Sequence, residues 1–133
     1  YDGDDAKWST GTSQYSDVME AGAEEGTDKS PVLKRGGKLK SKNKKFTFTH
    51  QKDGNVVLYD EDDKPLWASD TVDKDTDRLV IQEDGNLVLY NGPDPVWASD
   101  TCNSGAKRLV VQDDGNVVLY DGDDAKWATG TNQ

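Results

Sequence analysis

Five side-chain types recur in this chain at a fixed two-residue spacing, and together they suit a small ring that carries hydroxyl groups. The first set is Gln51, Asp53, Asn55, Val57 and Tyr59. Amide, carboxylate and phenol groups offer paired donors and acceptors to hydroxyls. The valine offers a nonpolar contact to the C–H face of the ring. This combination favours a sugar-binding site.

The same set returns twice. Its members are Gln82, Asp84, Asn86, Val88 and Tyr90 in the second occurrence, and Gln112, Asp114, Asn116, Val118 and Tyr120 in the third. A plainer interpretation is that the aspartate, asparagine and glutamine only cap a turn. A turn accounts for the first two residue types, but it does not require glutamine and tyrosine at constant offsets three times. We therefore favour three sugar-binding sites.

Each set lies within an internal repeat of about 30 residues. The repeats cover 50–71, 81–101 and 111–131, and each contains one tryptophan, at Trp67, Trp97 and Trp127. Such periodicity indicates one structural unit built three times. The tryptophans could stack on sugar rings, but their constant position favours a core role.

A fragment of a fourth repeat precedes these three, because residues 1–12 nearly duplicate 120–131. We interpret 1–14 as the closing strand of a preceding domain. The acidic segment 15–30 is interpreted as a linker with a short helical turn around 18–23. The main domain is then 31–133.

The elements that position the sites are predicted to be β-strands. Asp-Gly between alternating apolar residues is a strong hairpin signal, and it occurs at 53–54, 84–85 and 114–115. In the first repeat the expected strands are 46–51, 55–60 and 65–69. Side chains alternate between the faces of a strand, so Val56 and Leu58 should point inward and Asn55, Val57 and Tyr59 outward. The sequence predicts an all-β fold.

Composition narrows the function classes. Only 32% of the 133 residues are hydrophobic and 13 are glycine, which fits a turn-rich β architecture with a thin core. A net charge of −10 disfavours nucleic acid as a partner. No apolar run approaches the roughly 20 residues of a membrane span, so we expect no membrane insertion. The sequence leaves both a secreted and a cytoplasmic location open.

A basic stretch runs against the acidic average. It comprises Lys34, Arg35, Lys38, Lys40, Lys42, Lys44 and Lys45. One interpretation is a patch for phosphate or acidic glycans. The favoured one is a solvated edge strand whose lysines prevent edge-to-edge aggregation.

Other chemistry finds little support. The acidic clusters 60–63 and 121–124 lack the spacing of a calcium loop and are interpreted as solvated turns. His50 has no serine or cysteine partner in pattern, so neither a catalytic triad nor a zinc site is expected. Cys102 is the single cysteine, which excludes an internal disulfide. Three equivalent sets also argue against a glycoside hydrolase, whose two acids differ in role.

The pattern Gln-x-Asp-x-Asn-x-Val-x-Tyr resembles that of the bulb-type, or monocot, mannose-binding lectins, the snowdrop agglutinin family. The resemblance covers roughly 31–133. It includes LKRGGKL at 33–39, similar to the family's opening strand, and KWATGT at 126–131, similar to its closing strand. It implies a β-prism II fold, in which three four-stranded antiparallel sheets surround a pseudo-threefold axis and the tryptophans meet at the centre. It also implies binding of α-D-mannose and mannose-containing glycans, with no cofactor and no metal.

The resemblance implies roles for the five residue types. Asp53 and Asn55 would bond the axial 2-hydroxyl of mannose, Gln51 the 3-hydroxyl and Tyr59 the 4-hydroxyl, while Val57 packs on the ring carbons. The other two sets would act in the same way. Many plant members carry a disulfide that this chain lacks, since its position in the first repeat is Gly54.

Two points of function stay open at this stage. A non-sugar-binding interaction or structural module on the same fold is the alternative to a lectin. The family commonly exchanges its C-terminal strand between subunits, so a homodimer or a tandem-domain assembly is expected. Residues 1–12 would then occupy such a slot, preferably in a second chain.

Overall fold

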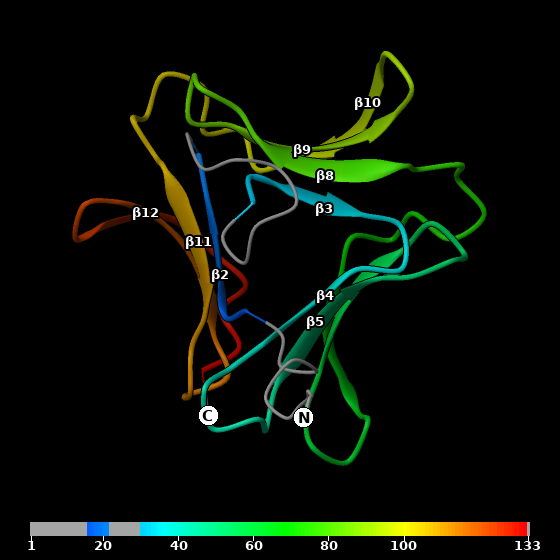
Figure 1. Cartoon of the computed structure of the whole chain (residues 1–133), viewed down its shortest axis with the longest axis vertical. Coiled ribbons are helices and arrows are strands. Elements are labelled where there is room, and N and C mark those ends of the chain that lie inside the picture. Colours follow the sequence, from blue (N-terminus) through cyan, green and yellow to red (C-terminus); the bar gives the residue numbers. More distant parts are fainter. Residues whose placement is uncertain (1–15, 22–29, 133) are drawn as a thin grey trace, which may run out of the picture.

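Three four-stranded antiparallel sheets make up the described chain. The computed structural model describes residues 16–21 and 30–132. Viewed along the short axis, the sheets form three sides of a prism (Figure 1). The sequence-based expectation of an all-β fold with three such sheets is confirmed.

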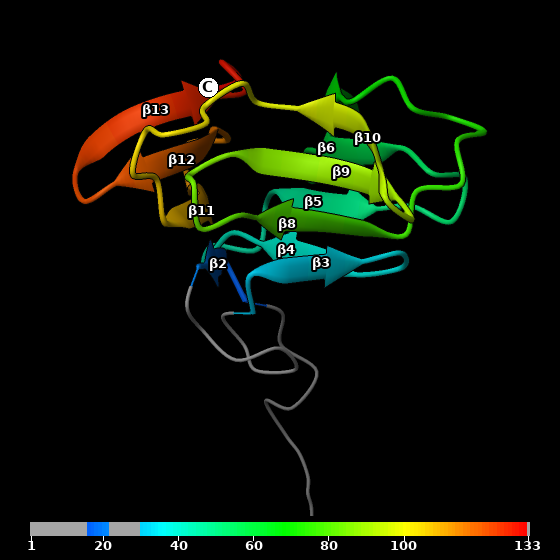
Figure 2. The ribbon, with the colours of Figure 1, turned by 90° about the horizontal axis from the view of Figure 1, so that it is seen from above.

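Each sheet combines three consecutive strands with a fourth from elsewhere in the chain. The first sheet contains β4 (Lys38–Lys40), β5 (Thr47–His50), β6 (Val56–Tyr59) and β7 (Pro65–Ala68). The second contains β3 (Val32–Lys34), β8 (Arg78–Ile81), β9 (Leu87–Asn91) and β10 (Asp94–Ala98). The third contains β2 (Val18–Glu20), β11 (Arg108–Val111), β12 (Val117–Asp121) and β13 (Asp124–Ala128). Strands β2, β3 and β4 lie at one end of the prism, opposite β10 and β13 (Figure 2).

The three strands of each repeat follow the predicted pattern. In the first repeat, β5, β6 and β7 lie within the expected ranges and pair antiparallel, with Phe48 opposite Leu58. Val56 and Leu58 are 1% and 0% exposed and belong to the central cluster. Val57 is also buried but does not join that cluster, because period-2 geometry turns it to the outer face.

The tryptophans meet at the centre of the prism. The ring centroids of Trp67, Trp97 and Trp127 are 5.4–5.5 Å apart, and each pair is edge-to-face. Such pairs contribute about 0.5–1.5 kcal/mol each beyond the area that they bury. The core interpretation of these residues is therefore confirmed.

The Asp-Gly turns depend on glycine. Gly54, Gly85 and Gly115 have φ angles of 93°, 88° and 91°. A Cβ on Gly54 would lie 1.9 Å from the carbonyl oxygen of Lys74, so no side chain fits there. The hairpin turn is thereby fixed in the conformation that delivers the site residues.

The interpretation of 18–23 as a helical turn in a linker is wrong. Val18–Glu20 is a strand that pairs with β11, with Met19 opposite Leu109. Met19 is 1% exposed and lies in the central cluster. A three-residue strand is too short to show periodicity, so tertiary pairing determines it. Segments 1–14 and 22–29, on which the expected fourth-repeat fragment and most of the linker fall, lie outside the described residues.

The stretch 33–39 does not form one opening strand. It contributes to β3 and β4, which belong to different sheets. Gly36, with φ 90°, turns the chain between them, and the N–H of Gly37 donates to the carbonyl of Lys34 at 2.8 Å.

Burial makes Met19 a test of the strand assignment. Replacing Met19 with alanine should lower the unfolding free energy by about 2 kcal/mol or more, because it leaves a cavity in the core. The matched control is Glu20→Gln in the same strand, which should change stability by less than about 0.5 kcal/mol. Urea denaturation measures both, and equal small effects would contradict the placement of β2.

His50 ties three segments together inside the prism. Its side chain is fully buried, with Nδ1 3.0 Å from the carbonyl oxygen of Leu33 and Nε2 2.9 Å from Oγ1 of Thr76. Burial lowers the pKa of His50 below its ordinary value of 6.5, and the charge of Arg35 adds to this effect. The hydrogen bond to Leu33 opposes it. His50 is therefore a structural residue.

The lowered pKa has a consequence for stability. Between the folded-state pKa and 6.5, the unfolded chain binds a proton at His50 that the folded chain does not. The unfolding free energy should therefore fall as the pH drops below 6.5, by up to about 1.4 kcal/mol per pH unit. His50 is the single histidine, so the part of the stability change between pH 7.5 and 5.5 that is lost in His50→Gln is its contribution. Stability that rises on acidification would contradict the assignment.

Candidate functional site

Each sheet carries one set of the five recurring residues on its outer face. In the first sheet, the turn between β5 and β6 supplies Gln51, Asp53 and Asn55, and β6 supplies Val57 and Tyr59. The second and third sheets place their sets in the same way, on β9 and β12 and the turns before them. The structure thus brings together the members of every predicted set.

A hydrogen bond joins the two ends of each set. The glutamine amide contacts the tyrosine hydroxyl in the pairs Gln51–Tyr59, Gln82–Tyr90 and Gln112–Tyr120. For Gln51, the amide orientation that satisfies both neighbours accepts from Tyr59 on Oε1. It donates from Nε2 to the two carboxylate oxygens of Asp53, each 3.2 Å away. The polar groups are therefore ordered before any ligand arrives.

The aspartate of each set has one oxygen committed to the turn. The backbone N–H groups of Asn55, Asn86 and Asn116 donate to Oδ1 of the aspartate two residues earlier, at 2.9 Å in all three turns. The capping role considered for these residues is thus real. Asp53, Asp84 and Asp114 nevertheless remain exposed, so a carboxylate oxygen faces solvent.

The asparagines are oriented by residues that sequence reasoning missed. Oδ1 of Asn55 accepts from the Ser69 hydroxyl at 3.0 Å and from the Thr71 N–H at 3.1 Å. The other repeats use Ser99 with Thr101, and Thr129 with Thr131. Within the described part of the chain, no residue accepts from Nδ2 of the three asparagines. The amide donor is thus left available to a ligand. These hydroxyl residues recur in the sequence as Ser-Asp-Thr or Thr-Gly-Thr shortly after each tryptophan, and this repetition could have identified them.

The valines form the floor between these polar groups. Val57, Val88 and Val118 are 3–4% exposed and lie directly opposite residues of the neighbouring strand on the same face. A pyranose ring lying over the floor would meet methyl groups beneath and donors and acceptors at its edge.

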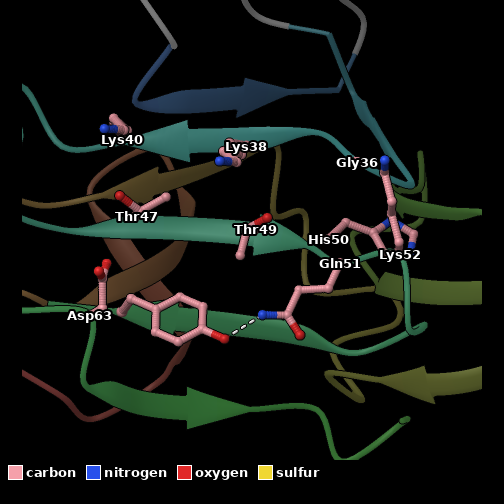
Figure 3. Close-up of a pocket in the computed structure, with 10 residues that line it drawn as sticks. Gly36, Lys38, Lys40, Thr47, Thr49, His50, Gln51, Lys52 and Asp63 are labelled. Carbon is pink, nitrogen blue, oxygen red and sulfur yellow. Dashed lines mark hydrogen bonds between the residues drawn. The ribbon is translucent and has the colours of Figure 1, made fainter. Parts of the chain in front are cut away.

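The three sites differ beyond these five residues. Arg78 lies over the ring of Tyr90 at 4.6 Å, and Arg108 lies over Tyr120 at 4.5 Å. The residue opposite Tyr59 is Thr47, which is too short to cover the ring. A groove of about 450 Å³ extends from Gln51 and Tyr59 across β5 to β4 (Figure 3).

The remaining candidates have structural explanations. Oδ1 of Asp60 accepts from the N–H groups of Asp62 and Lys64 at 2.9 Å, as a turn requires. In residues 16–21 and 30–132, no three His, Cys, Asp or Glu side chains gather as metal ligands do. The same residues contain no helix able to cross a membrane. Cys102 is free, and its hydrogen bond to Asp84 raises the pKa of the thiol.

Solved structures share both fold and sequence with this chain. A monomeric mannose-binding lectin from Gastrodia elata aligns with a TM-score of 0.74 and 38% identity, over 89% of this chain and 100% of the lectin. The snowdrop (Galanthus nivalis) agglutinin, solved with methyl-α-D-mannoside, aligns with a TM-score of 0.65 and 38% identity, over 88% of this chain and 98% of the agglutinin.

Sequence comparison alone gives shorter matches. The B-type lectin plumieribetin from Scorpaena plumieri is 47% identical over 64 residues, which is 48% of this chain and 55% of plumieribetin. The match to a mannose-specific lectin from Narcissus pseudonarcissus covers 45% of that protein. The chain thus spans about half the length of these curated relatives. No family model matches it.

The two solved lectins align over nearly their whole length at 38% identity, and their architecture is the one described above. The predicted resemblance and fold class are therefore confirmed. The chain belongs to the bulb-type, or monocot mannose-binding, lectin family and has the β-prism II fold.

Proposed function

We propose that this chain is a lectin that binds α-D-mannose and mannose-containing glycans through up to three sites, without a metal ion. The observation that carries the proposal is the state of the asparagines. Each has its amide oxygen held by hydroxyl and backbone donors, and its backbone N–H donates to the exposed aspartate two residues earlier, so Nδ2 stays available in the same turn as that carboxylate. A donor and an acceptor fixed side by side suit one sugar hydroxyl.

Each residue type has a proposed role. Asp53 and Asn55 bind the axial 2-hydroxyl, Gln51 the 3-hydroxyl and Tyr59 the 4-hydroxyl, while Val57 contacts the ring carbons. The equivalent residues do the same in the other two sites. Glucose carries its 2-hydroxyl equatorially, so it would leave the Asp–Asn pair poorly matched. Unmatched polar groups make a hydroxyl-reading site selective.

The sites are proposed to bind sugar without transforming it. A glycoside hydrolase needs two carboxyl groups in different environments across the scissile bond. Each of the three sets contains one aspartate, in the same turn position. The relatives found by comparison are likewise named as lectins.

Weak individual sites would act through multivalency. A single open site with few contacts should bind with a dissociation constant of about 1 mM, or about −4 kcal/mol. The three sites lie on three sides of the prism (Figure 1). A branched glycan or a glycan-rich surface that engages several sites would raise the apparent affinity by about 10²–10⁴.

Calorimetry with methyl α-mannoside tests the proposal. The affinity should be the same with and without EDTA, and methyl α-glucoside should bind at least about tenfold more weakly. Asn55→Asp, Asn86→Asp and Asn116→Asp keep the oxygen that accepts from the following segment but lose the amide donor. Each should therefore remove one site from the stoichiometry while the fold remains intact. Asp62→Asn, in an exposed turn, is the control and should leave all three sites.

Several outcomes would contradict the proposal. Strict dependence on calcium would exclude the metal-free site. Loss of all binding from one asparagine substitution would replace three sites by one composite site. A folded protein that binds no mannoside would instead support the non-sugar-binding module.

We also propose that the chain assembles as a homodimer or within a tandem-domain protein. Strands β7, β10 and β13 each end a sheet and have one edge without a partner strand among the described residues. Unpaired edges are natural sites of strand addition. A bluebell (Scilla campanulata) relative, 33% identical, is described as a two-domain lectin. Light scattering should give twice the monomer mass for the isolated chain at micromolar concentration. A monomer mass would leave the tandem arrangement as the alternative.

A further inference from the structure

A pair of lysines distinguishes the outer face of the first sheet from the outer faces of the other two. Lys38 and Lys40 project from β4 on the same face as the binding set, since Leu39 between them is in the core. Lys38 lies beside Thr49, whose partner on the next strand is Val57, and Lys40 lies beside Thr47, whose partner is Tyr59. Both lysines therefore lie two strands away from the proposed mannose position.

A groove connects the two lysines to the binding set. It is lined by Lys38, Lys40, Thr47, Thr49, Gln51 and Tyr59, and Lys52 and Asp63 stand at its margin. Figure 3 shows Lys38 and Lys40 along one strand, the threonines on the next, and Gln51 across the groove from them. The threonines are small, so the groove stays open between the ammonium groups and the sugar site.

The charges in this groove are not neutralised by the described chain. No residue of 16–21 or 30–132 forms an ion pair with Lys38, Lys40 or Lys52. The acidic groups nearby are Asp63 and Asp53, so the lining carries a positive excess. The net charge of −10 opposes anions at long range, but salt screens it beyond about 8 Å at physiological ionic strength.

The second and third sheets each lack part of this arrangement. The residues that match Thr47 are Arg78 and Arg108, which cover the tyrosine rings. These guanidinium groups are already engaged by the carbonyls of Gly92 and Gly122, respectively. At the position of Lys40 the second sheet has Lys34 and the third sheet has Glu20. At the position of Lys38 they have Val32 and Val18, respectively, so the first sheet alone carries the pair of lysines.

We infer that the first site prefers mannose that carries an anionic ester, phosphate or sulfate, next to the bound ring. The inference rests on the proposed mannose-binding function and assigns a ligand class to one of the three sites. If the 4-hydroxyl lies at Tyr59, the exocyclic C6 lies at the same end of the ring, because C5, which bears it, is adjacent to C4. Thr47 is the cross-strand partner of Tyr59 and Lys40 is the partner of Thr47, so an ester at O6 that turns toward β4 comes within reach of both. Lys38 and Lys40 bind it as point charges, and the Thr47 hydroxyl can donate to an ester oxygen.

Single-site proteins provide the test. The pairs N86D/N116D, N55D/N116D and N55D/N86D keep the structural oxygen and leave the first, second and third site, respectively. Each is titrated with methyl α-mannoside, mannose 6-phosphate and mannose 6-sulfate at 20 and 300 mM salt. The first-site protein should bind both esters about threefold to tenfold more tightly than the neutral mannoside at low salt. The gain should shrink at high salt.

Substitution of the lysines should remove the gain alone. K38Q/K40Q in the first-site protein should bind the esters no better than methyl α-mannoside, while affinity for the neutral sugar is unchanged. The matched control is K107Q/K126Q, which makes the same change in net charge at two exposed positions, one just before β11 and one in β13. That control should keep the preference.

The outcomes separate this inference from the function on which it rests. A first-site protein that binds mannoside but does not prefer the esters overturns the inference and leaves the lectin function standing. An equal gain at all three sites, or a gain that survives K38Q/K40Q, also overturns it. Failure of every single-site protein to bind any mannoside, while the chain stays folded, overturns the proposed function itself.

Discussion

The hydrogen bonds to the asparagine amide oxygen connect the fold of this protein to its sites. In each repeat they join the hairpin turn to the segment that follows the tryptophan strand, 13–16 residues later. A buried or half-buried amide is costly when it is left unpaired, so these bonds hold both segments in place. The same bonds determine which end of the amide faces outward. One set of contacts thus closes the repeat and orients its polar surface.

The tryptophan cluster imposes the threefold arrangement on which these local contacts rely. One indole comes from each sheet, and each packs edge-to-face on the other two. Three similar side chains at mutual distances of 5.4–5.5 Å require three similar sheets around them. Since the repeats are nearly identical on their inner faces, each sheet presents its outer set at an equivalent position. The number of sites therefore follows from the packing of the core.

The hairpins, the strands of each repeat and the core position of the tryptophans could be predicted from the sequence. The Asp-Gly turns, the alternation through Val56, Val57 and Leu58, and the constant tryptophan each depend on neighbours close in the chain. Strand β2 could not be predicted in this way. Val18–Glu20 has three residues and acquires its structure from β11, about 90 residues later. The division of 33–39 between two sheets was missed for a similar reason. A Gly-Gly turn can be recognised in the sequence, but the sheet that the following strand joins cannot. The residues that orient the asparagines were visible as a repeated Ser or Thr pattern, but their function depends on a contact that only the fold creates.

The alternation of inner and outer residues along each strand separates two kinds of constraint. Leu58, Leu89 and Leu119 meet the core and have almost no freedom to change, because their neighbours on all sides are packed. Thr47, Arg78 and Arg108, which lie on the outer face, already differ from one another without disturbing the tryptophan cluster. A duplicated repeat can therefore evolve at its surface while its interior stays fixed. In a threefold scaffold of this kind, one binding surface can change while the other two stay the same. Three initially identical copies can therefore become three binding sites of different specificity within one folded domain.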